Sequence, residues 1–170
     1  MKEKTITVNG VAKAFAMTGW RIGYIGAPEF IAKACTKMQG QVTSGANSIA
    51  QRATIAAVDA DPSVLKHMVQ AFHNRRDLVV GLIKEIPGLK INVPEGAFYV
   101  FPDVSHFFGK TLNGTLIKDA TDFSMYLLSE ANVATVTGDA FGNPNCLRIS
   151  YATSEAVLSE ALRRIKEALA

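Results

Sequence analysis

Apolar and polar positions in the first sixty residues predict two short strands followed by two helices. Thr5–Val8 is a run of β-branched and apolar residues that ends at the turn signal Asn9-Gly10. From Trp20 to Ile25 the bulky side chains alternate with Arg21 and Gly23, which is typical of a strand. Residues 28–40 and 48–60 have helical spacing. The first of these helices carries Phe30, Ile31, Ala34, Cys35 and Met38 on one face.

The rest of the chain alternates between helical and strand-like patterns. Asp61-Pro62 predicts the start of a long helix that ends at Pro87-Gly88, and Ser154 predicts the start of a last helix. Between them we expect a helix over residues 119–131, strands over 89–93, 97–101, 133–136 and 146–151, and loops over 103–117 and 137–145.

This order of elements predicts an α/β or α+β fold in two parts. Residues 61–170 contain enough helices and strands for a two-layer unit of their own. Residues 1–60 contain only two short strands, and a lone strand pair is marginally stable. We therefore expect this part to be the end of a larger sheet.

Composition changes this picture little but excludes several classes of function. Hydrophobic residues make up 48% and charged residues 19%, which is typical of a packed globular protein. The net charge of +3 is small and spread out, so we expect no nucleic-acid binding. No apolar run reaches membrane-spanning length, and the start Met-Lys-Glu-Lys does not resemble a signal peptide. We therefore expect a cytoplasmic protein with no membrane partner.

The cysteines and histidines predict neither a disulfide nor a metal site. Cys35 and Cys146 are far apart in apolar runs, so we interpret them as small core residues in a reducing compartment. The three histidines have no metal-ligand spacing with cysteines or carboxylates.

The stretch "NGVAKAFAMTGWRIGY", from Asn9 to Tyr24, raises a question of chemistry. It sets Lys13 among small and apolar residues and places Arg21 eight positions later. From position alone, an exposed loop lysine is the better interpretation. A lysine beside apolar or cationic groups can instead be a nucleophile that forms a Schiff base with pyridoxal phosphate, whose phosphate an arginine could bind. The spacing does not decide between these interpretations.

The same stretch resembles the lysine segment of fold-type I pyridoxal-phosphate enzymes in the class I/II aminotransferase family, and most of all the bacterial aspartate aminotransferase branch. Three more motifs follow in the family's order: "PEGAFYVFPD" at residues 94–103, "VTGDAFG" at 136–142 and "LRISYA" at 147–152. The resemblance covers essentially the whole chain.

The resemblance implies roles for four residues. Lys13 would form the Schiff base with pyridoxal 5'-phosphate and then move the proton between the substrate Cα and the cofactor carbon. Arg21 would bind the cofactor phosphate. Arg148 would bind the α-carboxylate of the amino acid, although without the family a surface strand arginine is an equal interpretation. Tyr99 would line the substrate side, although core packing explains it equally well.

The resemblance also implies what the whole molecule is. Residues 1–60 would be the tail of the large cofactor-binding domain, and residues 61–170 the C-terminal small domain, of a homodimeric enzyme of the pyridoxal-phosphate-dependent transferase fold. The reaction would convert aspartate and 2-oxoglutarate to oxaloacetate and glutamate. The family's aspartate on the pyridinium nitrogen lies upstream of the lysine, so we expect this C-terminal portion to be inactive alone.

Three other classes of function stay open. One is a different fold-type I enzyme, such as an aromatic, kynurenine or alanine aminotransferase or a carbon–sulfur lyase, because the side-chain pocket is mostly upstream. Another is a non-catalytic structural or dimerisation domain. The third is a basic face that binds an acidic partner, for which a steep salt dependence would be the signature.

Overall fold

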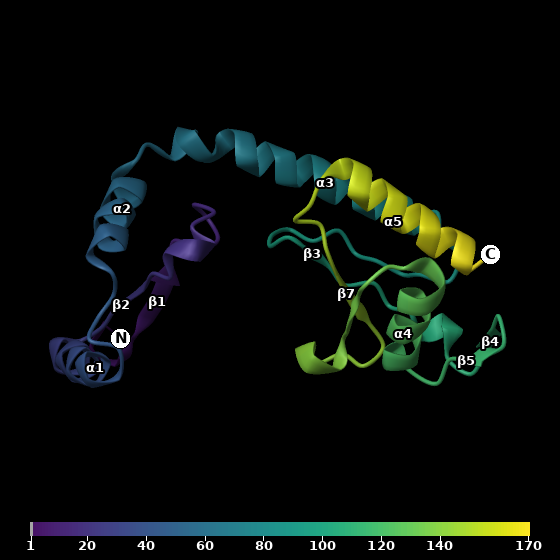
Figure 1. The fold of residues 1–170 in the computed structure, drawn as a ribbon, viewed down its shortest axis with the longest axis horizontal. Helices are drawn as coiled ribbons and strands as arrows, with labels where there is room; N and C mark the ends of the chain where they lie inside the picture. The colour runs from purple at the N-terminus through teal and green to yellow at the C-terminus, as the bar shows by residue number, and fades with distance from the viewer. Residues whose placement is uncertain (1) are drawn as a thin grey trace. The chain divides into compact units, whose positions relative to one another are not determined.

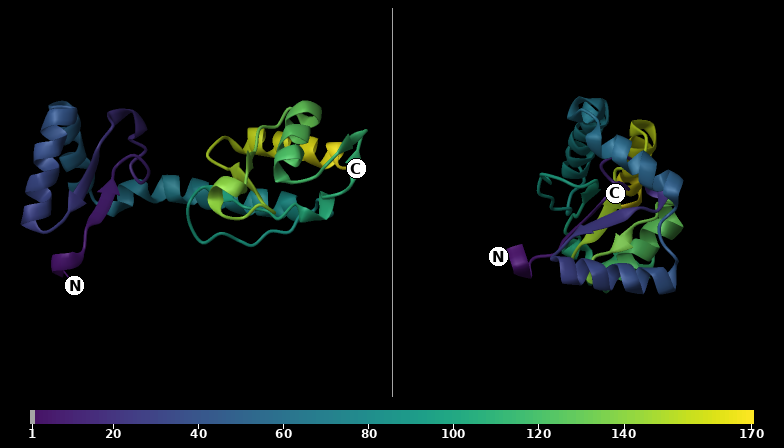
Figure 2. Two further views of the ribbon diagram at one scale, coloured as in Figure 1. Left: turned by 90° about the horizontal axis from the view of Figure 1, so that it is seen from below. Right: turned by 90° about the vertical axis from the view of Figure 1, so that its left-hand side faces the viewer.

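The computed structural model describes residues 2–170 and divides the chain into two compact units, Met1–His67 and Met68–Ala170. Each unit is described by itself below. Figures 1 and 2 show their elements from three directions.

The first unit contains one antiparallel strand pair and two helices. Strands β1 (Thr7–Gly10) and β2 (Gly23–Gly26) pair in the register Thr7↔Gly26 to Gly10↔Gly23. The chain then forms α1 (Glu29–Val42) and α2 (Ser48–Asp59), drawn in blue in Figure 2. Asn47 begins α2 because its side-chain oxygen accepts a 3.0 Å hydrogen bond from the backbone N–H of Ala50. Short 3₁₀ helices complete the unit: η1 (Lys2–Lys4), η2 (Thr18–Trp20) and η3 (Pro62–Leu65).

The first unit buries very little apolar surface. Among its described residues, only Val11 and Ala50 are buried hydrophobic side chains. Cys35 is exposed on α1, so the prediction that it is a core residue is wrong. The physical reason is that no described residue covers the apolar face of α1. Large exposed side chains of this unit include Val8, Phe30, Met38, Val42, Ile49 and Ile55.

The second unit is built on a three-stranded antiparallel sheet of order β3-β7-β6. Its strands are β3 (Tyr99–Val100), β6 (Val136–Thr137) and β7 (Leu147–Ser150), and a separate hairpin pairs β4 (Thr111–Leu112) with β5 (Thr115–Leu116). The helices are α3 (Lys66–Lys84), α4 (Ala120–Ala131) and α5 (Glu155–Ala168), with the 3₁₀ helices η4 (Ser105–Phe107) and η5 (Asp139–Phe141).

One hydrophobic core holds the second unit together. Val79 and Ile83 of α3 pack in the same buried cluster as Leu158 and Leu162 of α5, and Figure 1 shows these two helices side by side. Helix α4 and the sheet complete the cluster. Burial of this much apolar surface is the main stabilising contribution to the unit. Its fully buried large members include Phe123, Tyr126, Leu127, Leu147, Tyr151 and Ile165.

Helix ends in the second unit agree with the start signals in the sequence. Asp119 precedes α4 and accepts 2.9 Å hydrogen bonds from the backbone N–H groups of Thr121 and Asp122. Ser154 precedes α5 and accepts one from the N–H of Val157 at 3.3 Å. These caps satisfy donors that a helix leaves unpaired at its first turn.

The turn predicted at Asn9-Gly10 is wrong, because both residues lie inside β1 and pair with Tyr24 and Gly23. The long helix predicted from Asp61-Pro62 is divided into η3 and α3.

Other predicted segments also differ from the structure. Residues 89–93 do not form a strand, because only Lys90 pairs, in a single bridge to Asp103, and Pro94 lacks an N–H for a ladder. The strand predicted from Trp20 begins only at Gly23, because Arg21 has a left-handed backbone. The predicted loop 103–117 contains the β4–β5 hairpin. Asn113 and Gly114 both have positive φ there, as a tight hairpin turn requires.

Candidate cofactor and substrate sites

Lys13 and Arg21 lie on one loop, residues 11–22, between β1 and β2. The Gly10↔Gly23 pair closes this loop at its base. Inside it, the carbonyl oxygen of the fully buried Val11 accepts hydrogen bonds from the N–H groups of Phe15 and Met17, at 3.3 and 3.4 Å. The loop therefore has a fixed turn at its start, and the exposed Lys13 sits on that turn.

Arg21 has an unusual backbone conformation, and Ala16 in the same loop shares its positive φ. The φ and ψ of Arg21 are 53° and 48°, a left-handed conformation that non-glycine residues rarely adopt and that clusters at functional sites. One guanidinium nitrogen donates a 2.8 Å hydrogen bond to the carbonyl oxygen of Thr18. Among residues 2–170, the other N–H groups of the guanidinium have no partner. They are available to bind an anion.

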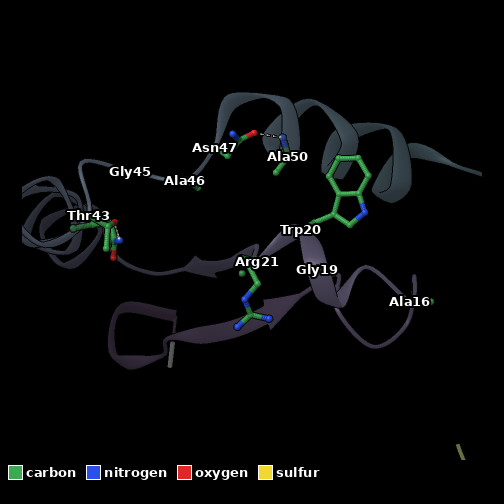
Figure 3. Close-up of a pocket in the computed structure, with 11 residues that line it drawn as sticks. Ala16, Gly19, Trp20, Arg21, Thr43, Gly45, Ala46, Asn47 and Ala50 are labelled. Atoms are coloured by element: carbon green, nitrogen blue, oxygen red, sulfur yellow. Dashed lines mark hydrogen bonds between the residues drawn. The ribbon is translucent and has the colours of Figure 1, made fainter.

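An open cleft of about 950 Å³ lies beside Arg21. Figure 3 shows that the side chains of Trp20 and Arg21 leave the backbone in opposite directions, with Trp20 toward α2. The other walls are the end of α1 and the connection to α2, through Thr43, Gly45 and Asn47. Lys13 does not line this cleft. The structure thus brings Lys13 and Arg21 onto one closed loop but not into this one cleft.

Arg148 lies on the outer face of the sheet in the second unit. Along β7, Leu147 is buried in the core, so its neighbour Arg148 points to the opposite face. The register pairs Val136 with Arg148, and Tyr99 with Ser150. Tyr99 is therefore the diagonal neighbour of Arg148 on the same face, a distance that aromatic side chains span.

The guanidinium of Arg148 contacts two aromatic rings and no hydrogen-bond acceptor. Its central carbon lies 4.5 Å from the ring centroid of Tyr99 and 4.1 Å from that of Phe141. It forms no hydrogen bond or ion pair with any residue from 2 to 170. A positioned guanidinium with unused N–H groups is a suitable receptor for a planar carboxylate. Sequence reasoning placed Arg148 and Tyr99 near a substrate but missed Phe141. The signal that could have found it is its place in the "VTGDAFG" motif.

Other kinds of site find little support in the described part of the chain. Within residues 2–170 there is no group of three histidine, cysteine or acidic side chains able to hold a metal ion. No helix described there combines the length and the apolar character needed to cross a membrane. Cys146 is buried as predicted, and burial raises the pKa of its thiol.

The chain combines an α/β fold, a loop that carries Lys13 and Arg21, and a strand that carries Arg148 with unused N–H groups. These features together fit one class of protein. The profile of the family "Aminotransferase class I and II" matches residues 1–165, and the chain belongs to that family. Among curated relatives, it is 52% identical over 169 residues to the aspartate aminotransferase of Rhizobium meliloti strain 1021, a match covering 99% of this chain and 41% of that protein. It is 49% identical to the bifunctional aspartate aminotransferase and glutamate/aspartate-prephenate aminotransferase of Petunia hybrida, covering 99% of this chain and 36% of that one.

Solved structures give the same result. The aspartate aminotransferase of Rhizobium meliloti superposes with a TM-score of 0.95 at 51% identity, covering 99% of this chain and 42% of that structure. The aromatic aminotransferase of Pyrococcus horikoshii superposes with a TM-score of 0.86 at 37% identity, covering 99% and 44%. The chain thus spans about two-fifths of the length of the relatives it matches. The resemblance to bacterial aspartate aminotransferases predicted from the sequence is confirmed.

Proposed function

We propose that the chain is the C-terminal part of a pyridoxal-phosphate-dependent aminotransferase that converts aspartate and 2-oxoglutarate to oxaloacetate and glutamate. The observation that carries this proposal is the match to the Rhizobium meliloti aspartate aminotransferase, at 51% identity and a TM-score of 0.95 over 99% of the chain. In the complete protein, residues 1–60 would end the large domain and residues 61–170 would be the small domain of each homodimer subunit. The division into compact units at His67 and Met68 supports a boundary in this region.

The described residues fit the cofactor that the family implies. Pyridoxal phosphate carries a dianionic phosphate and an aldehyde. The unused N–H groups of Arg21, at an open cleft, match the phosphate, and the exposed amine of Lys13, on the same closed loop, matches the aldehyde. When bound, the cofactor supplies an electron sink for the charge that develops when Cα loses its proton.

In this proposal each residue of the chain has a separate task. Arg21 holds the phosphate through paired N–H donors. Lys13 would anchor the cofactor through its amine, and the same amine would move the proton at the substrate Cα. Arg148 holds the α-carboxylate through its unused N–H edge, and Tyr99 supports that guanidinium from its diagonal position.

These 170 residues alone would bind the cofactor weakly and would not transaminate. They span about two-fifths of the relatives, and the carboxylate that keeps the pyridinium nitrogen protonated lies upstream of the lysine in the family. Without that carboxylate the cofactor is a poor electron sink. The binding step and the catalytic step therefore have to be tested separately.

A second candidate function is transamination of prephenate or aromatic amino acids. The Petunia relative is named for activity on prephenate as well as aspartate, and the Pyrococcus structure is named an aromatic aminotransferase. The full-length protein would separate these: faster transfer from aspartate than from phenylalanine to 2-oxoglutarate supports the first proposal, and the reverse order supports the second.

The cofactor site can be tested in the chain as it stands. The chain is mixed with pyridoxal phosphate, reduced with borohydride and digested, and the adduct on each lysine is quantified by mass spectrometry. We expect the adduct at Lys13 to exceed that at Lys33, an exposed lysine paired with Glu29, at least fivefold. Arg21→Ala should abolish this preference, because the phosphate loses its receptor. Equal labelling of Lys13 and Lys33 in the unsubstituted chain would overturn the proposed cofactor site.

A further inference from the structure

We infer that Phe141 is a positioning residue for Arg148: its ring holds the guanidinium so that the N–H edge stays open to a carboxylate. The inference rests on the proposed role of Arg148 in binding the substrate carboxylate. The guanidinium carbon lies closer to the ring centroid of Phe141, at 4.1 Å, than to that of Tyr99, at 4.5 Å. Phe141 is therefore the nearer of the two supports.

An aromatic face can hold a cation without using its hydrogen-bond donors. The negative face of the ring attracts the guanidinium electrostatically, whereas a carboxylate partner would occupy the N–H groups. Asp139 lies in the same turn as Phe141 but does not pair with Arg148. Its carboxylate instead accepts a long, 3.5 Å hydrogen bond from the hydroxyl of Thr137. The N–H groups of Arg148 are thus left for a ligand.

The ring of Phe141 is held in place although the residue is 46% exposed. It meets the ring of Phe101 edge to face, with centroids 6.4 Å apart and an interplanar angle of 88°. Its backbone N–H donates a 2.8 Å hydrogen bond to the carbonyl oxygen of Gly138. Gly138 in turn donates one of 2.8 Å to Cys146, which directly precedes β7. The turn with Phe141 is therefore tied to the strand with Arg148.

The turn also has no space for a side chain at Gly138. A Cβ there would overlap the carbonyl oxygens of Asn143 and Cys146, the second of them 2.5 Å away. Gly142, which closes the turn, has φ of 83°, a conformation that side chains disfavour. The two glycines on either side of Phe141 thus set where its ring lies. Phe141 is thus exposed and yet held firmly against a guanidinium that has no hydrogen-bonded partner. A positioning role explains this arrangement.

The test uses the whole chain, nuclear magnetic resonance of arginine side chains, and succinate as a plain carboxylate probe. The Nε–H signal of Arg148 is assigned by its loss in Arg148→Lys. Ring currents should displace this signal from the position of solvent-exposed arginines, and Phe141→Leu should remove much of the displacement, whereas Phe141→Tyr should retain it. The matched control is Phe30→Leu, which removes an equally bulky but 71% exposed ring from α1.

Succinate titration supplies the second readout. Phe141→Leu should raise the dissociation constant at Arg148 roughly three- to fivefold, the size of an exposed cation–π contact, with Phe141→Tyr and Phe30→Leu unchanged within twofold. If Phe141→Leu binds succinate as well as the unsubstituted chain while Arg148→Lys binds it more weakly, the inference is overturned and the proposed function stands. If Arg148→Lys leaves succinate binding unchanged, the proposed carboxylate role of Arg148 itself fails.

Discussion

The hydroxyl of Tyr126 in α4 donates a 2.6 Å hydrogen bond to the carbonyl oxygen of Ala168, the last residue of α5. The same hydroxyl accepts a 3.1 Å hydrogen bond from the side-chain amide of Asn113, in the β4–β5 turn. Tyr126 is only 2% exposed, and its burial raises the pKa of the phenol. One buried polar atom thus joins two helices and a hairpin of the second unit.

Removing this hydroxyl should destabilise the second unit. We expect Tyr126→Phe to lower the free energy of unfolding by about 1–2 kcal/mol, because Asn113 and Ala168 lose a buried partner. Urea unfolding followed by circular dichroism measures this. The control is Tyr24→Phe, since Tyr24 is 45% exposed and its change should stay within about 0.5 kcal/mol. Equal effects of the two substitutions would contradict a structural role for the Tyr126 hydroxyl.

A matched pair of glycine substitutions should change stability in opposite directions. Gly138→Ala should lower the free energy of unfolding by about 1–3 kcal/mol, because the new Cβ would overlap two backbone oxygens that cannot move independently. Gly81→Ala should stabilise by about 0.5–1 kcal/mol, since Gly81 lies inside α3 with open space around it. Chemical denaturation of both variants checks the pair. If Gly138→Ala left the free energy of unfolding unchanged, the turn that carries Phe141 would have to be more adaptable than the structure shows.

Acid should weaken the ion pairs on α5 within a defined range of pH. Arg163 and Arg164 donate hydrogen bonds of 2.7–2.8 Å to Glu160 and lower the pKa of its carboxyl from 4.5 to about 2. A carboxyl whose pKa is lowered in the folded state stabilises the fold, and the whole contribution is present at any pH above the ordinary pKa. This contribution is lost as the pH falls from about 4.5 to about 2. Over that range the melting temperature of Glu160→Gln should therefore fall less than that of the unsubstituted chain.

The difference will be small, because exposed ion pairs contribute little to stability. The control for this experiment is Glu130→Gln, since Glu130 forms no ion pair with any residue from 2 to 170. It should retain the full acid sensitivity of the unsubstituted chain. Identical acid profiles for Glu160→Gln and the unsubstituted chain would sink the prediction.

Backbone amides of the two units should differ in hydrogen exchange. Nearly all buried hydrophobic residues lie in the second unit, whereas Val11 and Ala50 are the only ones described in the first. Local stability follows the density of buried apolar contacts. We expect peptides from α1 and α2 to exchange at least tenfold faster than peptides from α4 and α5. Comparable protection of α1 and α5, measured by mass spectrometry, would mean that self-association covers the exposed apolar face.

Helices were predictable because their ends carry local chemical signals. The predicted helix over residues 119–131 begins one residue later in the structure, after the Asp119 cap, and ends at Ala131 as predicted. The last helix begins after Ser154 as predicted. The first helix continues through Gly40 to Val42, because a glycine with no other stop signal does not end a helix.

Strands were harder, because their pairing depends on residues far away in the chain. Residues 89–93 look like a strand by composition, yet only Lys90 pairs. The β4–β5 hairpin could have been predicted from Asn113-Gly114, the strongest short signal for a tight turn, between two Thr-Leu pairs. Cys35 was placed in the core because helical spacing identifies an apolar face but not whether anything covers it.

The candidate sites were expected from a resemblance and not from the residue pattern. The motifs around Lys13, Arg21 and Arg148 resemble those of the family, whereas the pattern alone did not separate a functional role from a surface role. The left-handed backbone of Arg21 and the ring of Phe141 against Arg148 depend on loop geometry, which the residue pattern does not encode.

The closed base of the loop over residues 11–22 has a practical consequence for protein engineering. Gly10 and Gly23 face each other across the strand pair, so the pairing of β1 with β2 holds the two ends of the loop together. The loop is therefore a natural graft point. If a loop from a distant relative were inserted between these glycines, the β1–β2 pair of this chain would still hold its two ends. New side chains could then be introduced without redesigning the strands.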